Sequence, residues 1–383
     1  MAHRAIPATF RVPQMLVRAK LSDVLHAPLV PLILAAAAIC GVLTSVIGCS
    51  KTKDPLLSTP QIALQSLSAK ALYFNGAAQP WLLASRPDLL TPEDRDARSG
   101  RSRAFAQAAA APRLFRQLDR KDRFDTVLLV GDPTQYRALL DHLIETKDFG
   151  LAYVDHTCLV FKRDAAAAWS AKALESLRQR LGGASRRERA DCLALTAGKL
   201  AAAHRTADAK ALIDEALALD ERSPEAWTAS ANYHVTRGDW PEALAAADRA
   251  LALDADHLGA LATRTQIFYA TKRYDQALAV SQRVSARLPD DPNVLFKHAQ
   301  IAHEAHAFQA EIAALEKVIA LAETDHRPTT GYRLYLAQAY TAAGKGQPAI
   351  ENFNRVLADP ELPEDQRKFA SESIARIKSR TGL

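Results

Sequence analysis

The sequence predicts a mainly α-helical protein in which a small α/β domain and an N-terminal hydrophobic leader precede a solenoid of helical hairpins. Three observations support this prediction. Residues 27–48 contain no charged residue, residues 126–163 show a strand–helix–hairpin pattern, and a 34-residue period begins at Ala190. The chain has 383 residues, only 15 glycines and 48% hydrophobic residues, which suits a packed, helix-rich chain of more than one domain.

The leader, residues 1–48, is either a signal peptide or a membrane anchor. Its uncharged run is long enough to span a bilayer. Basic residues precede that run and would keep the N-terminus in the cytoplasm, so both interpretations export the rest of the chain. A start at Met15 instead of Met1 would give the basic segment the ordinary length of a signal peptide.

The end of the leader favours cleavage and lipidation. Val46-Ile47-Gly48-Cys49 resembles a bacterial lipobox, which has an aliphatic residue three positions before the cysteine and a small residue directly before it. The resemblance implies a lipoprotein of the bacterial cell envelope, anchored through the thiol of Cys49 and facing the periplasm or the exterior. The alternative is a single uncleaved span in the inner membrane.

Residues 49–66 are expected to form a tether, and residues 67–163 a small α/β domain. Strands are predicted at Ala71–Asn75 and Thr126–Val130, and a further pair joined at Asp155-His156 is expected to form a hairpin. Thr126–Val130 is apolar on both faces, as a central strand should be. After that strand, Asp132 and Pro133 suit the N-cap and first position of a helix.

Between the first two strands the pattern predicts a short helix at residues 80–85, a loop at residues 86–103 and a helix bent at Pro112. Residues 70–163, with "YVDHTCLVFKR" at their end, resemble the small soluble domain at the C-terminus of many membrane glycosyltransferase-like proteins. That resemblance implies an α/β fold and an envelope setting. It implies no transferase activity, because the membrane core of those proteins is absent from this segment.

Residues 190–363 are expected to form five repeats that resemble tetratricopeptide repeats. In residues 224–257 the aromatic, small and turn residues of that family stand at the expected positions, namely Trp227, Ala231, Gly238, Trp240, Ala243 and Ala250. Glu311 departs from the pattern, since a small residue is expected there, and predicts a looser fourth repeat. Residues 164–189 should link and cap one end of the array, and residues 364–383 the other, with Phe369, Ile374 and Ile377 on the apolar side. Because both ends look capped, we expect the array to fold without the α/β domain.

The first helices of such repeats line a concave groove. Amides recur at one position of four consecutive repeats, and an amide can donate to and accept from an extended peptide backbone. The predicted partner-binding residues are Asn232, Gln266, Gln300, Gln338, Tyr269, Phe296 and His303. The alternative is that amides are simply tolerated on a solvated helix face.

Composition and motifs argue against other classes of function. The formal net charge of +6 is partly due to the leader, and no concentrated basic face for nucleic acid is evident. The four cysteines have no paired spacing, so Cys158 and Cys192 are expected to be buried and free. The histidines of "HEAH" lie three residues apart rather than four, and no hydrolase, nucleotide or dinucleotide motif is present. We therefore expect no enzyme, no cofactor and no metal site.

Together these patterns predict an envelope-anchored repeat scaffold that mediates protein–protein interaction in a membrane-associated complex. Its partners would be a protein or extended peptide in the concave groove and the membrane at the N-terminus. The alternative is a membrane-spanning accessory subunit of a cell-envelope glycosylation or polysaccharide-export system.

Overall fold

The computed structural model describes residues 69–96, 99–146, 148–163 and 171–382, so the leader, Cys49 and the tether lie outside the described residues. The described residues divide into two compact units. The amino-terminal unit ends at Pro289, and the carboxyl-terminal unit begins at Asp290. No helix among the described residues is both long enough and apolar enough to cross a membrane.

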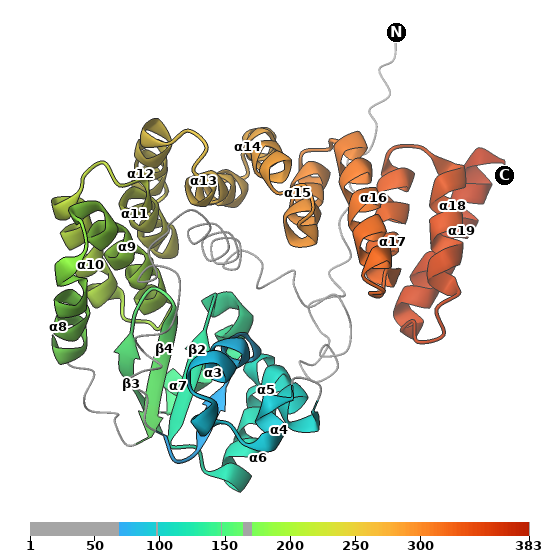
Figure 1. Ribbon diagram of the computed structural model, residues 1–383. Helices are drawn as coiled ribbons and strands as arrows, with labels where there is room; N and C mark the ends of the chain where they lie inside the picture. Colours follow the sequence, from blue (N-terminus) through green and yellow to red (C-terminus); the bar gives the residue numbers. More distant parts are fainter. Residues whose placement is uncertain (1–68, 97–98, 147, 164–170, 383) are drawn as a thin grey trace. The chain divides into compact units, whose positions relative to one another are not determined.

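The amino-terminal unit begins with a four-stranded sheet in the order β1-β2-β4-β3 (Figure 1). The strands are β1 (Leu72–Phe74), β2 (Thr126–Val130), β3 (Phe149–Val154) and β4 (Cys158–Arg163). β1 runs parallel to β2, whereas β2–β4 and β3–β4 are antiparallel. Every residue of β2 is buried, and β1 and β4 pair with its two edges, so β2 is a central strand of the sheet. The predicted strands and hairpin are confirmed.

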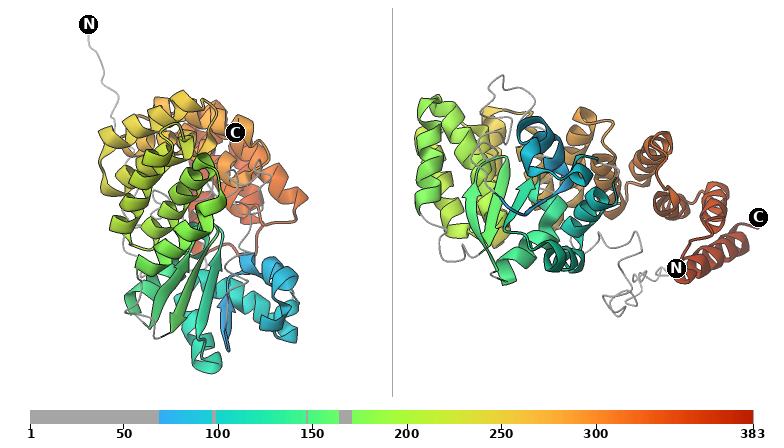
Figure 2. Two further views of the ribbon diagram at one scale, coloured as in Figure 1. Left: turned by 60° about the vertical axis from the view of Figure 1, so that its left-hand side comes forward. Right: turned by 60° about the horizontal axis from the view of Figure 1, so that its bottom comes forward.

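Helices fill the connection between β1 and β2 and lie beside the β1 edge in all three views (Figures 1 and 2). They are η4 (Gly76–Ala78), α3 (Gln79–Ser85), η5 (Pro87–Leu89), α4 (Pro92–Arg95), α5 (Gly100–Ala110) and α6 (Pro112–Asp122). The predicted loop at residues 86–103 is wrong, because Thr91 and Asp94 form a capping box that starts α4. Pro112 begins a new helix instead of bending one, since Ala111 before it is extended.

Aromatic rings fill the space between β1 and these helices. The ring of Tyr73 lies 4.9 Å from Phe105 and 5.0 Å from Phe115, measured between centroids. The Tyr73 hydroxyl donates to the Phe105 carbonyl at 2.8 Å, so its one polar atom is satisfied, and burial raises the pKa of Tyr73. After β2 the chain forms η6 (Pro133–Tyr136) and α7 (Arg137–Thr146), and Asp132 caps η6 as predicted.

The remaining helices of this unit begin with α8 (Ala171–Arg180) and η7 (Leu181–Gly183), and from α9 (Arg186–Ala202) onward they form hairpins with the predicted period. The helices after α9 are α10 (Thr206–Leu219), α11 (Pro224–Arg237), α12 (Trp240–Leu253), α13 (Leu258–Ala270) and α14 (Tyr274–Arg287). Small residues let the two helices of a hairpin approach closely: Ala231, Ala243 and Ala247 are fully buried in the core between α11, α12 and α13. Gly238 ends α11 in the left-handed conformation with φ 77°.

The sheet and the first repeats share one hydrophobic core. Side chains of β2 and β4 belong to the same buried cluster as Leu193, Ala197 and Leu200 of α9. A buried cation also joins them, because Lys199 is only 6% exposed and its Nζ donates to the Gly131 carbonyl at 2.5 Å. This arrangement argues against the expectation that the repeats fold without the α/β domain.

The carboxyl-terminal unit contains α15 (Pro292–Glu304), α16 (Phe308–Thr324), α17 (Thr330–Ala342), α18 (Gly346–Leu357) and α19 (Glu364–Thr381). Phe353 and Ile377 are buried between α17, α18 and α19, so α19 covers the last hairpin as predicted. Phe369 is 41% exposed, which corrects its predicted place on the buried side of α19. Its ring still lies 6.2 Å from that of Phe353.

Candidate protein-binding surface

In the amino-terminal unit the predicted amides lie on adjacent first helices. Asn232 is on α11 and Gln266 on α13, and the Thr263 hydroxyl of α13 donates to Asn232 Oδ1 at 2.8 Å. Asn232 is half-buried, whereas Gln266 is only 7% exposed. Tyr269, one turn after Gln266, is half-buried and its ring lies 5.5 Å from Tyr274. The burial of Gln266 does not fit a solvated helix face, which was the alternative, and it also leaves little of the Gln266 amide exposed to a partner.

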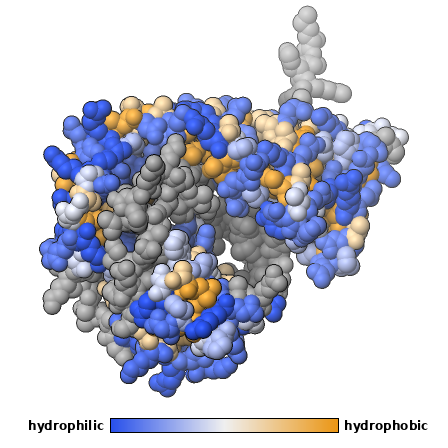
Figure 3. Space-filling view, in the orientation of Figure 1, coloured by the Kyte–Doolittle hydropathy of each residue, from blue (hydrophilic) through white to orange (hydrophobic). Residues whose placement is uncertain are grey.

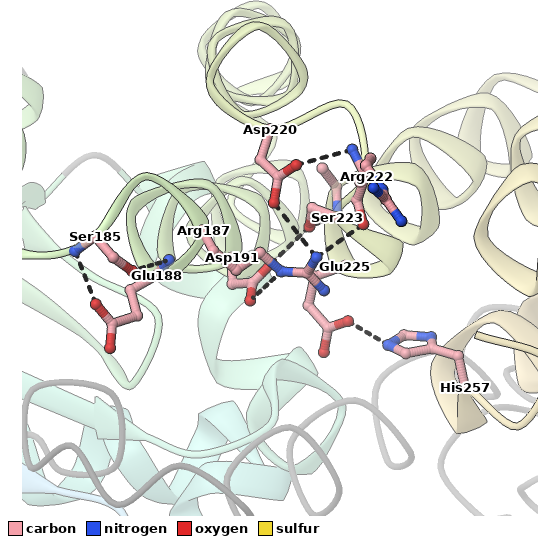
Figure 4. A network of polar contacts seen from close by, with 10 residues as sticks. Ser185, Arg187, Glu188, Asp191, Asp220, Arg222, Ser223, Glu225 and His257 are labelled. Carbon is pink, nitrogen blue, oxygen red and sulfur yellow. Dashed lines mark hydrogen bonds and ion pairs between the residues drawn. The ribbon is translucent and has the colours of Figure 1, made fainter. Parts of the chain in front are cut away.

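A polar network connects the N-terminal ends of α9, α11 and α13, each of which is the first helix of its hairpin (Figure 4). Arg187 of α9 contacts Asp191 at 3.0 Å and Asp220 at 3.3 Å, and it also donates to the Arg222 carbonyl at 2.8 Å. The Ser223 hydroxyl, at the N-cap of α11, donates to Asp191 at 2.6 Å. Burial raises the pKa of Asp191, and these two partners oppose that shift. The network therefore holds α9 and α11 in a fixed register.

His257 continues the network from α11 to α13. It is the N-cap of α13, and its Nδ1 accepts a hydrogen bond from the Ala260 backbone at 3.2 Å. Since Nδ1 accepts, the proton of a neutral ring lies on Nε2, which contacts the carboxylate of Glu225 at the start of α11. Sequence reasoning missed this network, because its partners lie about one repeat apart and only the repeat register brings them together.

In the carboxyl-terminal unit an aromatic cluster lies between two first helices. The ring of Phe296 on α15 is 5.3 Å from each of Tyr332 and Tyr335 on α17, in edge-on geometry. All three side chains are half-buried, so part of each ring faces solvent. Gln300, one turn after Phe296, and Gln338 on α17 are also half-buried, and Lys297 Nζ donates to Gln300 Oε1 at 3.3 Å. The structure thus places Phe296 and Gln300 on one helix, beside the aromatic rings of the next first helix.

His303, also predicted to bind a partner, has a second contact inside its own hairpin. Its Nδ1 lies 3.0 Å from a carboxylate oxygen of Glu311 on α16, whose side chain is only 4% exposed. The hydrogen bond to Glu311 raises the pKa of His303. This pairing gives the buried carboxylate of Glu311, at a position where the repeat pattern expects a small residue, a hydrogen-bond partner. The His303 side chain remains 50% exposed and so stays accessible from solvent.

The described residues offer few other places for chemistry. They contain no group of three or more histidine, cysteine, aspartate or glutamate side chains placed to hold a metal ion. Cys158 and Cys192 are free and buried, as expected, and burial raises the pKa of the Cys158 thiol. At the turn after β2, Asp132 accepts from the backbone and the hydroxyl of Thr134, so its carboxylate occupies the position where a phosphate would bind.

Comparison with known proteins supports the repeat fold. A profile of the tetratricopeptide repeat family matches residues 234–301. This stretch spans α12, α13 and α14 and parts of α11 and α15, and it therefore has the tetratricopeptide repeat character that the 34-residue period predicted. A search of curated proteins found no match.

Among solved structures the chain is similar to helical-repeat proteins. A segment of MamA from Desulfovibrio magneticus RS-1, which runs from residue 41 to the end, is 19% identical, and the match covers 44% of this chain and 93% of that segment with a TM-score of 0.37. YrrB, described as a TPR protein with an unusual peptide-binding site, is 15% identical over 53% of this chain and 97% of its own, with a TM-score of 0.42. A thermophilic TPR protein from Thermus thermophilus, TTC0263, is 20% identical over 47% of this chain and 95% of its own, with a TM-score of 0.31.

Proposed function

We propose that the protein is an envelope-anchored scaffold in which the first helix of each repeat contributes to a surface that binds an extended segment of a partner protein. The observation that supports this most directly is the aromatic cluster of Phe296, Tyr332 and Tyr335, which is half-buried beside two half-buried amides. Exposed ring area can take an apolar side chain of a peptide, and aromatic residues are enriched where protein partners bind.

The amides supply the second part of the recognition. Gln300 and Gln338 recur at the same position of consecutive repeats, on first helices. Each amide has two donor hydrogens and one acceptor oxygen, which matches the alternating carbonyl and amide groups of an extended backbone. Such contacts depend little on sequence, so the aromatic cluster would supply the preference for particular side chains.

The anchoring is proposed from the lipobox-like stretch that ends at Cys49. A diacylglycerol group on the Cys49 thiol would hold the chain at the membrane surface. Replacing Cys49 with Ser should abolish metabolic labelling by a radioactive fatty acid and leave the precursor uncleaved. Mature wild-type protein that still contains residues 15–48 would show instead that the leader is an uncleaved span.

The binding surface is tested by position-specific crosslinking followed by affinity measurement. A photoreactive amino acid at Gln300 should crosslink a partner in intact cells, and the same group at Asn354, exposed on the second helix α18, should not. The crosslinked protein identified by mass then serves as the ligand. Replacing Gln300 and Gln338 with Ala should weaken its binding about tenfold or more, at about 1 kcal/mol for each amide contact.

The matched control replaces two exposed polar residues of α18, Gln347 and Asn354, with Ala. This control should bind the partner like the wild type. Equal affinity of the Gln300/Gln338 variant and the control, with unchanged thermal melts, would show that the partner does not use the first helices of the carboxyl-terminal unit.

A further inference from the structure

Helix α6 has an exposed basic face that the sequence pattern did not reveal. Arg113, Arg116, Arg120, Lys121 and Arg123, the residue that caps the helix, are all exposed. None of them lies within ion-pair distance of a carboxylate among the residues that the structure describes. At about 100° per residue Arg113, Arg116 and Arg120 fall within about 60° of one another on the helix, so they form one face.

The acidic residues of the same helix do not neutralise this face. Asp119 pairs with Arg163 of β4 at 2.5 Å, and Asp122 pairs with Arg101 of α5 at 2.6 Å. Both carboxylates point toward the domain, where 21% and 15% of their side chains are exposed. Basic and acidic residues are therefore mixed along the sequence "RLFRQLDRKDR". In the fold the basic side chains are exposed to solvent, whereas the two carboxylates face the rest of the domain.

Several exposed arginines of the repeats are paired with carboxylates. Arg187, Arg237 and Arg287 each lie against a carboxylate, in the pairs with Asp220, Asp239 and Asp256. The basic side chains of α6 are instead available to an external anion. The lower part of the surface in Figure 3, over α4 to α6 in the orientation of Figure 1, is largely hydrophilic.

An anionic bilayer fits this face better than nucleic acid does. Leu114 follows Arg113 in the sequence and lies about 100° from it around the helix, at the flank of the basic face. It is 37% exposed and could enter the interfacial region of a bilayer, as apolar residues of basic amphipathic helices do. The only aromatic residue of α6, Phe115, is buried, so the helix offers no ring on which a base could stack. Guanidinium groups bind phosphate oxygens in bidentate geometry, which suits phospholipid headgroups.

We infer that α6 docks the α/β domain onto the phosphate headgroups of an anionic phospholipid bilayer. The inference rests on the proposed membrane anchoring, because the leader would hold this domain close to the same surface. Each basic residue near an anionic membrane strengthens association about fivefold, so three of them together contribute about a hundredfold.

The test uses the full chain, purified in detergent and reconstituted into vesicles of phosphatidylcholine alone or mixed equally with phosphatidylglycerol. Flotation reports anchoring, and acylation of Lys121 by an amine-reactive ester, read by mass spectrometry, reports docking of α6. Lys121 should react at least fivefold more slowly on phosphatidylglycerol vesicles than on phosphatidylcholine vesicles. Lys368 on α19, whose side chain is 75% exposed, serves as the internal reference.

Two further comparisons test the role of charge. The protection of Lys121 should disappear near 1 M salt, where the screening length falls to about 3 Å. It should also disappear in the Arg113→Gln/Arg116→Gln/Arg120→Gln variant. The control variant Arg376→Gln/Lys378→Gln/Arg380→Gln, which removes the same charge from exposed positions of α19, should keep the protection.

The outcomes separate the two proposals. A chain that floats on both vesicles with Lys121 equally reactive overturns docking by α6 and leaves the anchor intact. A chain that floats only with phosphatidylglycerol, with Lys121 protected, supports docking and overturns anchoring by the leader. Flotation with neither vesicle overturns both. Protection of Lys121 by soluble poly-glutamate but not by phosphatidylglycerol would overturn the inference in favour of an acidic protein partner.

Discussion

The junction between the sheet and the first repeat offers a sharp test of how the amino-terminal unit is held together. Lys199 lies in the last turn of α9, and its ammonium donates to the carbonyl of Gly131, the residue that follows β2. The buried carboxylates of Asp132 and Asp155 lie close enough to interact with it. Burial lowers the pKa of Lys199, and the charge of these carboxylates opposes that shift. Replacing Lys199 with Met keeps an unbranched side chain of similar length and removes only the charge and the donor.

The expected cost follows from the contacts that remain. A hydrogen bond from a charged donor contributes about 1.5–3 kcal/mol. The Gly131 carbonyl would keep only the Tyr136 hydroxyl, at 3.2 Å, and the two carboxylates would lose their nearby cation. Relief of the desolvation of the ammonium offsets part of this loss. We therefore expect the free energy of unfolding to fall by about 2 kcal/mol, or the melting temperature by about 4–8 °C for a unit of this size.

Tryptophan fluorescence during urea unfolding measures this change in the correct unit, because Trp81, Trp169, Trp227 and Trp240 all precede Pro289. The matched control is Lys210→Met on α10, whose side chain is 43% exposed and pairs with Asp214. A surface change of this kind should stay within about 0.5 kcal/mol of the wild type. Equal stability of the two variants would show that the Lys199 contact does not hold the sheet to α9.

Further predictions concern three other places. Because the pKa of His303 is raised, its pairing with Glu311 contributes fully to stability below pH 6.5 and is lost as the pH rises through the folded pKa. The free energy of opening of α15 and α16, measured by hydrogen exchange, should therefore fall on the basic side of that pKa by less than about 1 kcal/mol, because the His303 side chain is 50% exposed. His303→Gln should show no such fall. Asn75→Ala should cost about 2–4 kcal/mol by urea unfolding, because the Asn75 amide pairs both backbone groups of Val130. Phe353→Ala should cost about 3–5 kcal/mol, measured by exchange of α17 to α19, since Phe353 is 1% exposed; exchange no faster than in Phe369→Ala would contradict this.

Local patterns in the sequence were sufficient for much of the fold. The strands, the hairpin turn at Asp155 and the helical hairpins depend on hydrophobic period, small residues and turn residues that lie within about 40 positions of one another. Helix α4, in the connection between β1 and β2, was not predicted. Thr91 and Asp94 start a helix inside a charged stretch, and only their reciprocal hydrogen bonds distinguish that stretch from a loop.

Features that depend on distant partners could not be predicted. Lys199 looks like a solvated residue in "TAGKLAA", yet its partner Gly131 is 68 positions away. The basic face of α6 is hidden in a mixed-charge sequence until Arg101 and Arg163 remove its two carboxylates from the surface. Glu311 appeared to be a defect of the fourth repeat although its partner is near in sequence: His303 lies 8 positions away, and only the turn of the hairpin brings the two side chains together. The binding of a partner by the recurring amides Asn232, Gln266, Gln300 and Gln338 stays a prediction.

The shared core gives the α/β domain a structural role in the repeat array. A solenoid buries each repeat against its neighbours, so the first repeat has an apolar side with no neighbour to cover it. In α9 Ala190, Leu193, Ala194 and Leu200 are all nearly inaccessible, and they belong to the same buried cluster as β2, β4 and α8. The sheet therefore caps the first repeat, while α19, with its exposed outer face, caps the last hairpin of the carboxyl-terminal unit. Repeats that begin at residue 164 would expose the apolar side of α9, so the array depends on the domain that α6 would dock to the membrane.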